Sequence, residues 1–289
     1  MRAIDKAIQL RDGRKLAYAE YGDLQGKPLF FFHGIPGSRV FRPPDKITEK
    51  MGMRLICVDR PGSGLSTFQP RRRILDWPND IAQLANALGI ERFAVAGHSG
   101  GGPYVAACAY ALPERVTVAV ILCGAALLDT PESTQGMITL NKLGFKIGRY
   151  IPWPLWWLLI WFFYHKGRVD PAAVMERDAR HRPLGDSKLW ERPEIRQVCY
   201  KSTAEGLRQG IRGHAWETRL ITRPWGFQPE DIPVPVYLWY GEDDNLTPVS
   251  MGRYLASKIP NSKATFCEGE GHLLLFPHWE EILAVIRDA

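Results

Sequence analysis

A serine between glycines is the residue of this sequence best placed to act as a nucleophile. The segment Gly97-His98-Ser99-Gly100-Gly101 follows the short apolar run Phe93–Ala96 and precedes the small-residue stretch Pro103–Leu112. A strand, a sharp turn and a helix in this order lift a serine hydroxyl above the edge of a sheet, and the glycines leave room for the strained turn. The pattern G-x-S-x-G often arises by chance, so the flanking elements carry most of the prediction that Ser99 attacks an ester-like carbonyl.

A serine hydroxyl is a weak nucleophile and needs a general base. We expect His272 to be that base, because it ends the glycine-containing segment Glu268–His272 just after the last expected strand. A loop beyond the carboxyl end of a strand can reach over the sheet to the serine. His98 is the neighbour of the serine, but the turn should direct its ring elsewhere, and His278 opens the last expected helix.

A carboxylate must hold the imidazole in one tautomer and stabilise its positive charge. Three acids, Glu242, Asp243 and Asp244, follow the expected strand Val234–Tyr240. We favour Asp244, with Asp243 as the main alternative. Asp129 is a more distant option.

The negative oxygen that forms during the attack needs two preorganised N–H donors. One should be the amide of Gly100, directly after the nucleophile. The other should come from the loop His33–Ser38, which follows the apolar strand Leu29–Phe32. Ile35 is the expected donor in that loop, because Pro36 has no N–H.

The remaining pattern predicts an α/β fold with a mostly parallel central sheet flanked by helices. Residues 1–125 and 224–289 alternate between strand-like and helix-like segments and should form the core. Residues 126–223 have no clear strand and many aromatic residues, so we interpret them as an inserted helical cap over the carboxyl edge of the sheet. The turn Asp12-Gly13 predicts a hairpin. The other expected elements are the strands Leu29–Phe32, Arg54–Val58, Phe93–Ala96, Val116–Leu122, Val234–Tyr240 and Lys263–Cys267, and the helices Asp76–Leu88, Pro103–Leu112, Ser250–Ile259 and His278–Arg287.

The chain resembles the α/β-hydrolase superfamily, and most of all its bacterial branch with a helical cap. That branch includes carboxylesterases, lipases, perhydrolases and carbon–carbon bond hydrolases. The family pattern G-x-x-D-x-x-x-P places the triad acid on Asp244, and the order Ser99, Asp244, His272 is the family's chain order. Related epoxide hydrolases and dehalogenases carry Asp at the nucleophile position, which is Ser99 here. The motifs that carry the resemblance are His33-Gly34-x-Pro36-Gly37, Asp59-Arg60-Pro61-Gly62-x-Gly64-x-Ser66, Gly97-x-Ser99-x-Gly101, Gly241-x-x-Asp244-x-x-x-Pro248 and Gly271-His272.

A tryptophan-rich stretch is the most unusual part of the expected cap. Ile151–Tyr164 contains four tryptophans but is shorter than the roughly 20 residues that span a bilayer. No acid lies between Ser133 and Val169, and five basic residues do. We expect this stretch to line the roof of an apolar pocket, and we hold a second contact, with a membrane or lipid surface through residues 142–168, as compatible with that.

The sequence therefore predicts cleavage of an ester or lipid-like small molecule with an apolar acyl or aromatic group, through an acyl-enzyme. The same triad would also serve acyl transfer, perhydrolysis, or cleavage of a C–C or amide bond, and a non-catalytic receptor is a further alternative. This chemistry needs no metal and no organic cofactor. We expect further substrate contacts from His33, Gly34, His98, Trp153 and Trp157.

Composition favours a globular protein in a reducing compartment. The net charge is +6, but the basic residues are scattered, so we expect no nucleic-acid partner. The N-terminal residues have no apolar run of signal-peptide length, which predicts a cytoplasmic protein, peripheral to the membrane at most. The odd number of cysteines and the absence of C-x-x-C pairs predict free thiols at Cys57, Cys108, Cys123, Cys199 and Cys267.

Overall fold

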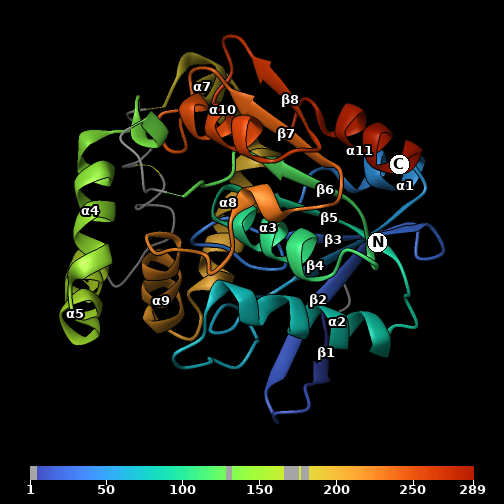
Figure 1. The fold of residues 1–289 in the computed structure, drawn as a ribbon, viewed down its shortest axis with the longest axis horizontal. Coiled ribbons are helices and arrows are strands. Elements are labelled where there is room, and N and C mark those ends of the chain that lie inside the picture. The colour runs from blue at the N-terminus through green and yellow to red at the C-terminus, as the bar shows by residue number, and fades with distance from the viewer. Residues whose placement is uncertain (1–4, 128–131, 166–175, 177–181) are drawn as a thin grey trace.

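An eight-stranded sheet forms the centre of the molecule (Figure 1). The computed structural model describes residues 5–127, 132–165, 176 and 182–289. The strand order is β1-β2-β4-β3-β5-β6-β7-β8, with β1–β2 and β2–β4 antiparallel and the other pairs parallel. The strands are β1 (Asp5–Gln9), β2 (Lys15–Gly22), β3 (Lys27–Phe32), β4 (Met53–Val58), β5 (Phe93–His98), β6 (Val116–Leu122), β7 (Val236–Gly241) and β8 (Ser262–Cys267).

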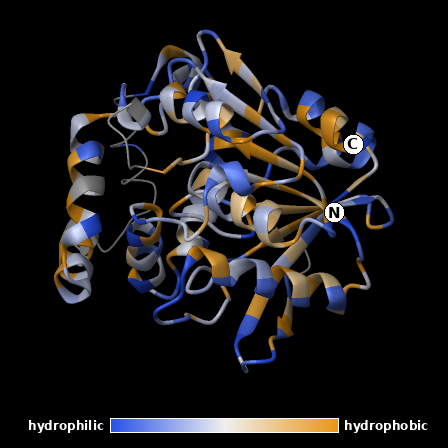
Figure 2. Cartoon of the chain, viewed as in Figure 1, coloured by the Kyte–Doolittle hydropathy of each residue, from blue (hydrophilic) through white to orange (hydrophobic). Residues whose placement is uncertain are grey.

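Both faces of the sheet are buried, because successive side chains of a strand point to opposite faces. On β3, Phe30 and Phe32 pack with the helices α2 (Trp77–Ala87), α3 (Gly102–Ala111) and α10 (Val249–Lys258). Leu29 and Phe31 face the other layer, which α1 (Asp45–Lys50) and α11 (Trp279–Asp288) cover. The central strands are accordingly among the most hydrophobic parts of the chain in Figure 2. Eight strands with helices on both faces define an α/β-hydrolase fold.

The described elements between β6 and β7 are helical. They are a short turn of 3-10 helix at Glu132–Thr134, then α4 (Thr139–Tyr150), α5 (Trp153–His165), α7 (Leu184–Trp190), α8 (Pro193–Gly206) and α9 (Arg212–Ile221), and a second 3-10 turn at Pro229–Asp231. Helices α4 and α5 stand at one edge of the molecule, and α9 lies between them and the sheet (Figure 1). Among the described residues, no helix has both the length and the apolar character needed to cross a membrane. The boundaries 126 and 223 remain a prediction.

Most sequence-predicted elements are found within two residues of their expected ends. The hairpin around Asp12-Gly13 is confirmed, and β1 and β2 pair in the register Asp5 to Ala19. All five cysteines are unpaired, and four of them are buried. The short helix α1 was not expected, because the six residues Asp45–Lys50 are too few to show a clear helical period.

Candidate active site

The turn at Ser99 has the strained geometry of a nucleophile elbow. Ser99 lies between β5 and α3 with φ +56°, a left-handed conformation that residues with side chains rarely adopt. The neighbouring glycines are required by space: a Cβ on Gly101 would lie 2.2 Å from the Phe32 carbonyl oxygen, and one on Gly97 would lie 2.9 Å from the Gly101 carbonyl oxygen. The turn that carries Ser99 therefore needs glycine at positions 97 and 101, because a side chain there would clash with the backbone.

Asp244 and His272 form a buried pair at the ends of β7 and β8. His272 Nδ1 lies 2.7 Å from Asp244 Oδ2, with Asp244 3% and His272 9% exposed. The other carboxylate oxygen of Asp244 accepts hydrogen bonds from the amides of Leu246 at 2.8 Å and Thr247 at 3.1 Å. The Thr247 hydroxyl lies 2.9 Å from Asp244 Oδ2. These contacts fix the carboxylate so that it faces Nδ1, which leaves Nε2 as the nitrogen available for proton transfer.

The pair shifts both pKa values in the directions that an acid–base dyad needs. Burial alone would lower the pKa of His272, but the charge and hydrogen bond of Asp244 outweigh it and raise the pKa above its ordinary value. Burial alone would raise the pKa of Asp244, but His272 and the two loop amides bring it below its ordinary value. The two shifts describe one interaction, in which an ionised carboxylate stabilises a charged imidazole.

His98 links the elbow to this pair. Its ring nitrogen Nε2 lies 2.8 Å from the His272 carbonyl oxygen, and the two rings have centroids 4.6 Å apart. Burial, and then the charge of His272, lower the pKa of His98 to about 3, so its ring is neutral. Among contacts between described residues, the Ser99 hydroxyl makes no hydrogen bond. Such catalytic hydrogen bonds often tighten only when substrate binds.

The loop after β3 lies against the serine, where the sequence placed one oxyanion donor. A Cβ built on Gly34 would lie 3.2 Å from Ser99 Cβ, and one built on Gly100 would lie 2.4 Å from Ile35 Cδ1. Within the described part of the chain, the Ile35 amide donates to no other residue. The amides of Ile35 and Gly100 thus belong to neighbouring segments at the serine, and their role toward an oxyanion remains a prediction.

Arg60 holds this loop by its carbonyl oxygens. The buried guanidinium donates to the His33 carbonyl at 2.5 Å and to the Gly34 carbonyl at 2.9 Å. It also donates to Glu217 of α9 at 2.7 Å. Turning these carbonyls toward Arg60 constrains the peptide planes of the loop and so the direction of the following amides. The sequence placed Arg60 in a family motif but gave it no role.

Glu217 also forms an ion pair with a second buried cation. It pairs with Arg72 and accepts a hydrogen bond from the Tyr104 hydroxyl at 3.0 Å. Arg60 also lies over the Tyr104 ring, at 4.9 Å from its centroid. One carboxylate from α9 therefore balances two guanidiniums of the core beside the oxyanion loop.

Asp186 is a functional-site residue that sequence reasoning missed. It lies on α7 and is 2% exposed, and its two oxygens accept hydrogen bonds from the amides of His272 and Leu273, each at 2.8 Å. The fit is close, because a Cβ on Gly271 would lie 2.6 Å from the Asp186 carboxyl carbon. Asp186 thus fixes the backbone that carries His272. No pattern marks it, since an acid in the first turn of a helix is usually a solvated one.

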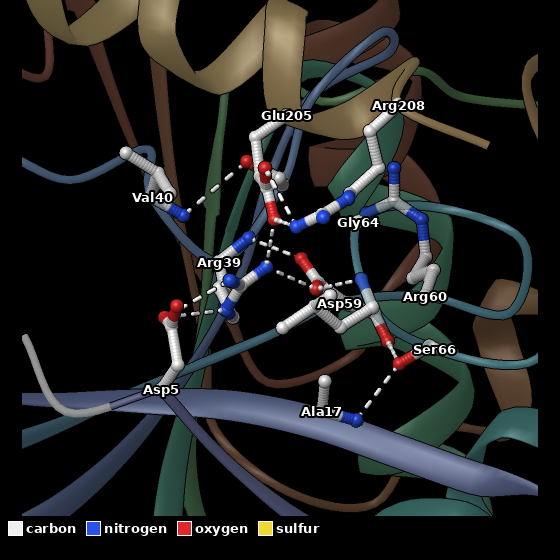
Figure 3. A network of polar contacts seen from close by, with 12 residues as sticks. Asp5, Ala17, Arg39, Val40, Asp59, Arg60, Gly64, Ser66, Glu205 and Arg208 are labelled. Carbon is white, nitrogen blue, oxygen red and sulfur yellow. Dashed lines mark hydrogen bonds and ion pairs between the residues drawn. The ribbon is translucent and has the colours of Figure 1, made fainter. Parts of the chain in front are cut away.

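A second buried network fixes the far side of the oxyanion loop (Figure 3). Asp59 accepts from the Arg39 amide at 2.6 Å and from the Arg39 guanidinium at 2.7 Å. The same guanidinium donates to Glu205 of α8 at 2.7 Å. Gly64 is required here, because it has φ +52° and a Cβ would lie 2.0 Å from the Asp59 carboxylate. The family motif that begins at Asp59 therefore organises the loop structure around the site.

The contacts of the other predicted substrate-binding residues, His33, Trp153 and Trp157, are as follows. His33 is buried, with Nδ1 2.8 Å from the Gly34 carbonyl oxygen. Trp153 packs edge-on against Trp216 at 4.6 Å, and Trp157 is 36% exposed. Among the contacts of the described residues, none joins either tryptophan to Ser99 or His272. Substrate binding remains a prediction for both tryptophans and for His33, Gly34 and His98.

The alternative acids and bases are placed elsewhere. Asp243 is exposed, although its amide donates to the Glu270 carbonyl at 2.9 Å. His278 pairs with Glu270 at 2.9 Å and lies against Trp239. Asp129 lies outside the described residues.

Two groups of described residues bring potential metal ligands within 4.8 Å of one another. The first is Cys123 with Asp244 and His272, whose ligand atoms are already used by the dyad and its hydrogen bonds. The second is Cys267 with Glu270 and His278, where the ion pair of the last two accounts for their proximity. Neither group offers a vacant set of four ligands of the kind that a structural zinc site uses.

Comparison with known proteins agrees with this geometry. Residues 27–147 match the family model described as "alpha/beta hydrolase fold". An esterase from Rhodococcus sp. ECU1013 superposes with a TM-score of 0.70 over 100% of this chain and 98% of the other, at 19% identity. With the sheet order and the elbow at Ser99, these matches show that the chain has an α/β-hydrolase fold.

Two relatives with different named activities show how varied the matching proteins are. The bifunctional esterase/perhydrolase DCH of Acinetobacter calcoaceticus is 28% identical over 94% of this chain and 92% of its own length. A proline iminopeptidase of Xylella fastidiosa is 36% identical, but over only 38% of this chain and 36% of its own length. The chain thus matches about a third of the second relative, and both the activity and the substrate must be argued from this chain's own residues.

Proposed function

We propose that this chain is a serine hydrolase that cleaves carboxylic esters through an acyl-enzyme. The observation that carries the proposal is the strained Ser99 turn beside the buried Asp244–His272 pair. A left-handed serine between obligatory glycines is costly to fold, and such strain is concentrated at functional sites. The match to the α/β-hydrolase family model and the similarity to an esterase/perhydrolase over most of both chains support the same conclusion.

In the proposed mechanism, Ser99 Oγ attacks the ester carbonyl carbon while His272 Nε2 takes the hydroxyl proton. Asp244 stabilises the imidazolium, and the amides of Ile35 and Gly100 stabilise the oxyanion. His272 then protonates the departing alcohol, which leaves Ser99 acylated. Water attacks the acyl-enzyme with His272 as base, which releases the acid and restores Ser99.

Asp186, Arg60 and Asp59 act in this proposal as positioning residues. Asp186 fixes the backbone of His272, and Arg60 fixes the carbonyls of the oxyanion loop. We assign apolar acyl or aromatic esters as the substrate class, because the inserted segment is rich in aromatic and aliphatic side chains.

The names of the relatives suggest two other chemistries for the same acyl-enzyme route. The same acyl-enzyme could react with peroxide, as the name of the Acinetobacter relative indicates for that protein. Alternatively, Ser99 could attack an amide, since several partial relatives are named proline iminopeptidases. The triad serves all these reactions, and the pocket decides among them.

The test is labelling with a fluorophosphonate probe, followed by a substrate panel. We expect wild type to be labelled, Ser99→Ala not to be labelled, and Ser257→Ala, an exposed serine of α10, to be labelled like wild type. The labelled enzyme should then hydrolyse p-nitrophenyl esters with a preference for longer acyl chains. An unlabelled wild type would refute the activated serine and favour a non-catalytic receptor. Labelling together with cleavage of proline p-nitroanilide, but of no ester, would replace the ester proposal with the amide one.

A further inference from the structure

We propose that the exposed face of α5 docks on an anionic lipid surface. This inference does not depend on the proposed function, because it concerns a surface outside the Ser99 site. The surface is the apolar stripe formed by Leu155, Leu158, Leu159 and Phe162, which are 57%, 51%, 36% and 55% exposed. Their spacing i, i+3, i+4 and i+7 places all four on one side of the helix.

The packing of Trp156 fixes which face of α5 looks outward. Trp156 is buried, and its indole N–H donates to the Ala215 carbonyl of α9 at 2.9 Å. Helix α4 closes on the same ring, because a Cβ on Gly148 would lie 3.0 Å from Trp156 Cη2. Since Trp156 is held between α4 and α9, the rotation of α5 is set and the apolar stripe faces away from the protein. The packing of Trp156 therefore determines that the stripe is exposed.

Helix α4, which also packs on Trp156, carries further exposed side chains. Leu143 and Tyr150 of α4 are 52% and 76% exposed, and Arg149 lies over the Tyr150 ring, at 5.9 Å from its centroid. Lys142 is exposed on the same helix. Four large apolar side chains on one side of a helix exceed the scattered apolar residues of an ordinary surface, of which Leu24 at 37% is an example.

Charge decides between an anionic lipid surface and a second copy of the chain. The segment 133–165 contains Lys142, Lys146 and Arg149 and no acidic residue. Apolar and aromatic side chains beside basic ones are typical of helices that lie in the interface of anionic membranes. A symmetric dimer through this face would bring the same basic residues together, and its few residues fall short of the roughly 20 to 30 a side found in stable interfaces.

The experiment is vesicle co-sedimentation of the Ser99→Ala chain, in which loss of the nucleophile prevents turnover during the assay. The vesicles are phosphatidylcholine alone and phosphatidylcholine with phosphatidylserine. We expect binding to the mixed vesicles, and we expect Leu155→Ser/Phe162→Ser to weaken it at least tenfold. Lys142→Ala should weaken it by up to about fivefold on the anionic vesicles only. Leu24→Ser is the matched control and should bind like the parent.

Three outcomes would overturn the proposal. They are absence of binding to the mixed vesicles, equal binding to both vesicle types, and equal loss of binding in the Leu24→Ser control. A dimer in sedimentation velocity that Leu155→Ser/Phe162→Ser dissociates, without vesicle binding, would overturn it in favour of a second copy. Hydrolysis of a soluble short-chain ester by the otherwise wild-type Leu155→Ser/Phe162→Ser chain checks that the fold is intact. A failure of that activity in every chain would count against the proposed function and not against lipid docking.

Discussion

Replacement of Asp244 by Asn should nearly abolish turnover, whereas the same replacement one residue earlier should not. Asp244 is buried and lies 2.7 Å from His272 Nδ1. Asp243 is exposed, so Asp243→Asn is a matched control with the same chemistry at a neighbouring position.

The structure determines why Asn is disruptive at 244. The amides of Leu246 and Thr247 both donate to Asp244 Oδ1, so the Asn oxygen would stay there and its NH₂ group would face His272. Nδ1 would then have to accept that N–H, which leaves the proton on Nε2. A protonated Nε2 cannot take the proton of Ser99. Loss of the correct tautomer costs about 10⁴-fold in kcat, or roughly 5.5 kcal/mol of transition-state stabilisation.

Initial rates on a p-nitrophenyl ester measure this difference. We expect Asp243→Asn to keep kcat within about twofold and Asp244→Asn to lose about four decades, with little change in KM because the mutation leaves substrate contacts intact. Thermal unfolding of both variants shows whether the fold is retained. Full activity of Asp244→Asn, or its loss in Asp243→Asn, would refute the assignment of the acid.

Three more outcomes follow from the contacts around the dyad. Asp244 raises the pKa of His272, and the base must be neutral, so kcat/KM should rise with pH through a pKa above 6.5. A profile that is flat from pH 5 to 9 would contradict this role of His272. Asp186→Asn replaces one acceptor by a donor opposite a backbone N–H, so we expect a loss of about 2 kcal/mol in unfolding free energy and about tenfold in kcat. Urea melts and initial rates measure both losses. Lys188→Ala, exposed on the same helix, is the control and should match wild type in both. Glu217→Gln leaves two buried guanidiniums without their carboxylate, so urea unfolding should show a loss of about 3–5 kcal/mol, and a change below 1 kcal/mol would show that the network is not needed.

The sequence predicts the elements and the elbow well because their causes are local. Short apolar runs form the central strands, and the glycines around Ser99 are needed for steric reasons that act within the turn. Asp244 and His272 could be predicted because each follows a strand of a parallel sheet, whose carboxyl ends meet at one edge.

The positioning residues could not be predicted, because their causes are tertiary. Asp186 is 86 residues from His272 in the chain, and Glu217 is 157 residues from Arg60. Nothing in the local sequence of either acid distinguishes it from a solvated residue at a helix surface. The burial that gives each one its role arises only when the inserted helices pack on the core.

The inserted helices reach the site through three carboxylates, and this changes how their contribution should be understood. Asp186 of α7 holds the His272 backbone, Glu217 of α9 holds Arg60, and Glu205 of α8 holds Arg39. Each contact acts on a loop that the proposed chemistry needs, so substitutions in these helices should alter catalytic rate and not only substrate preference. Helix α5 packs instead on α9 through Trp156. Its exposed apolar stripe can therefore serve a surface without disturbing the dyad.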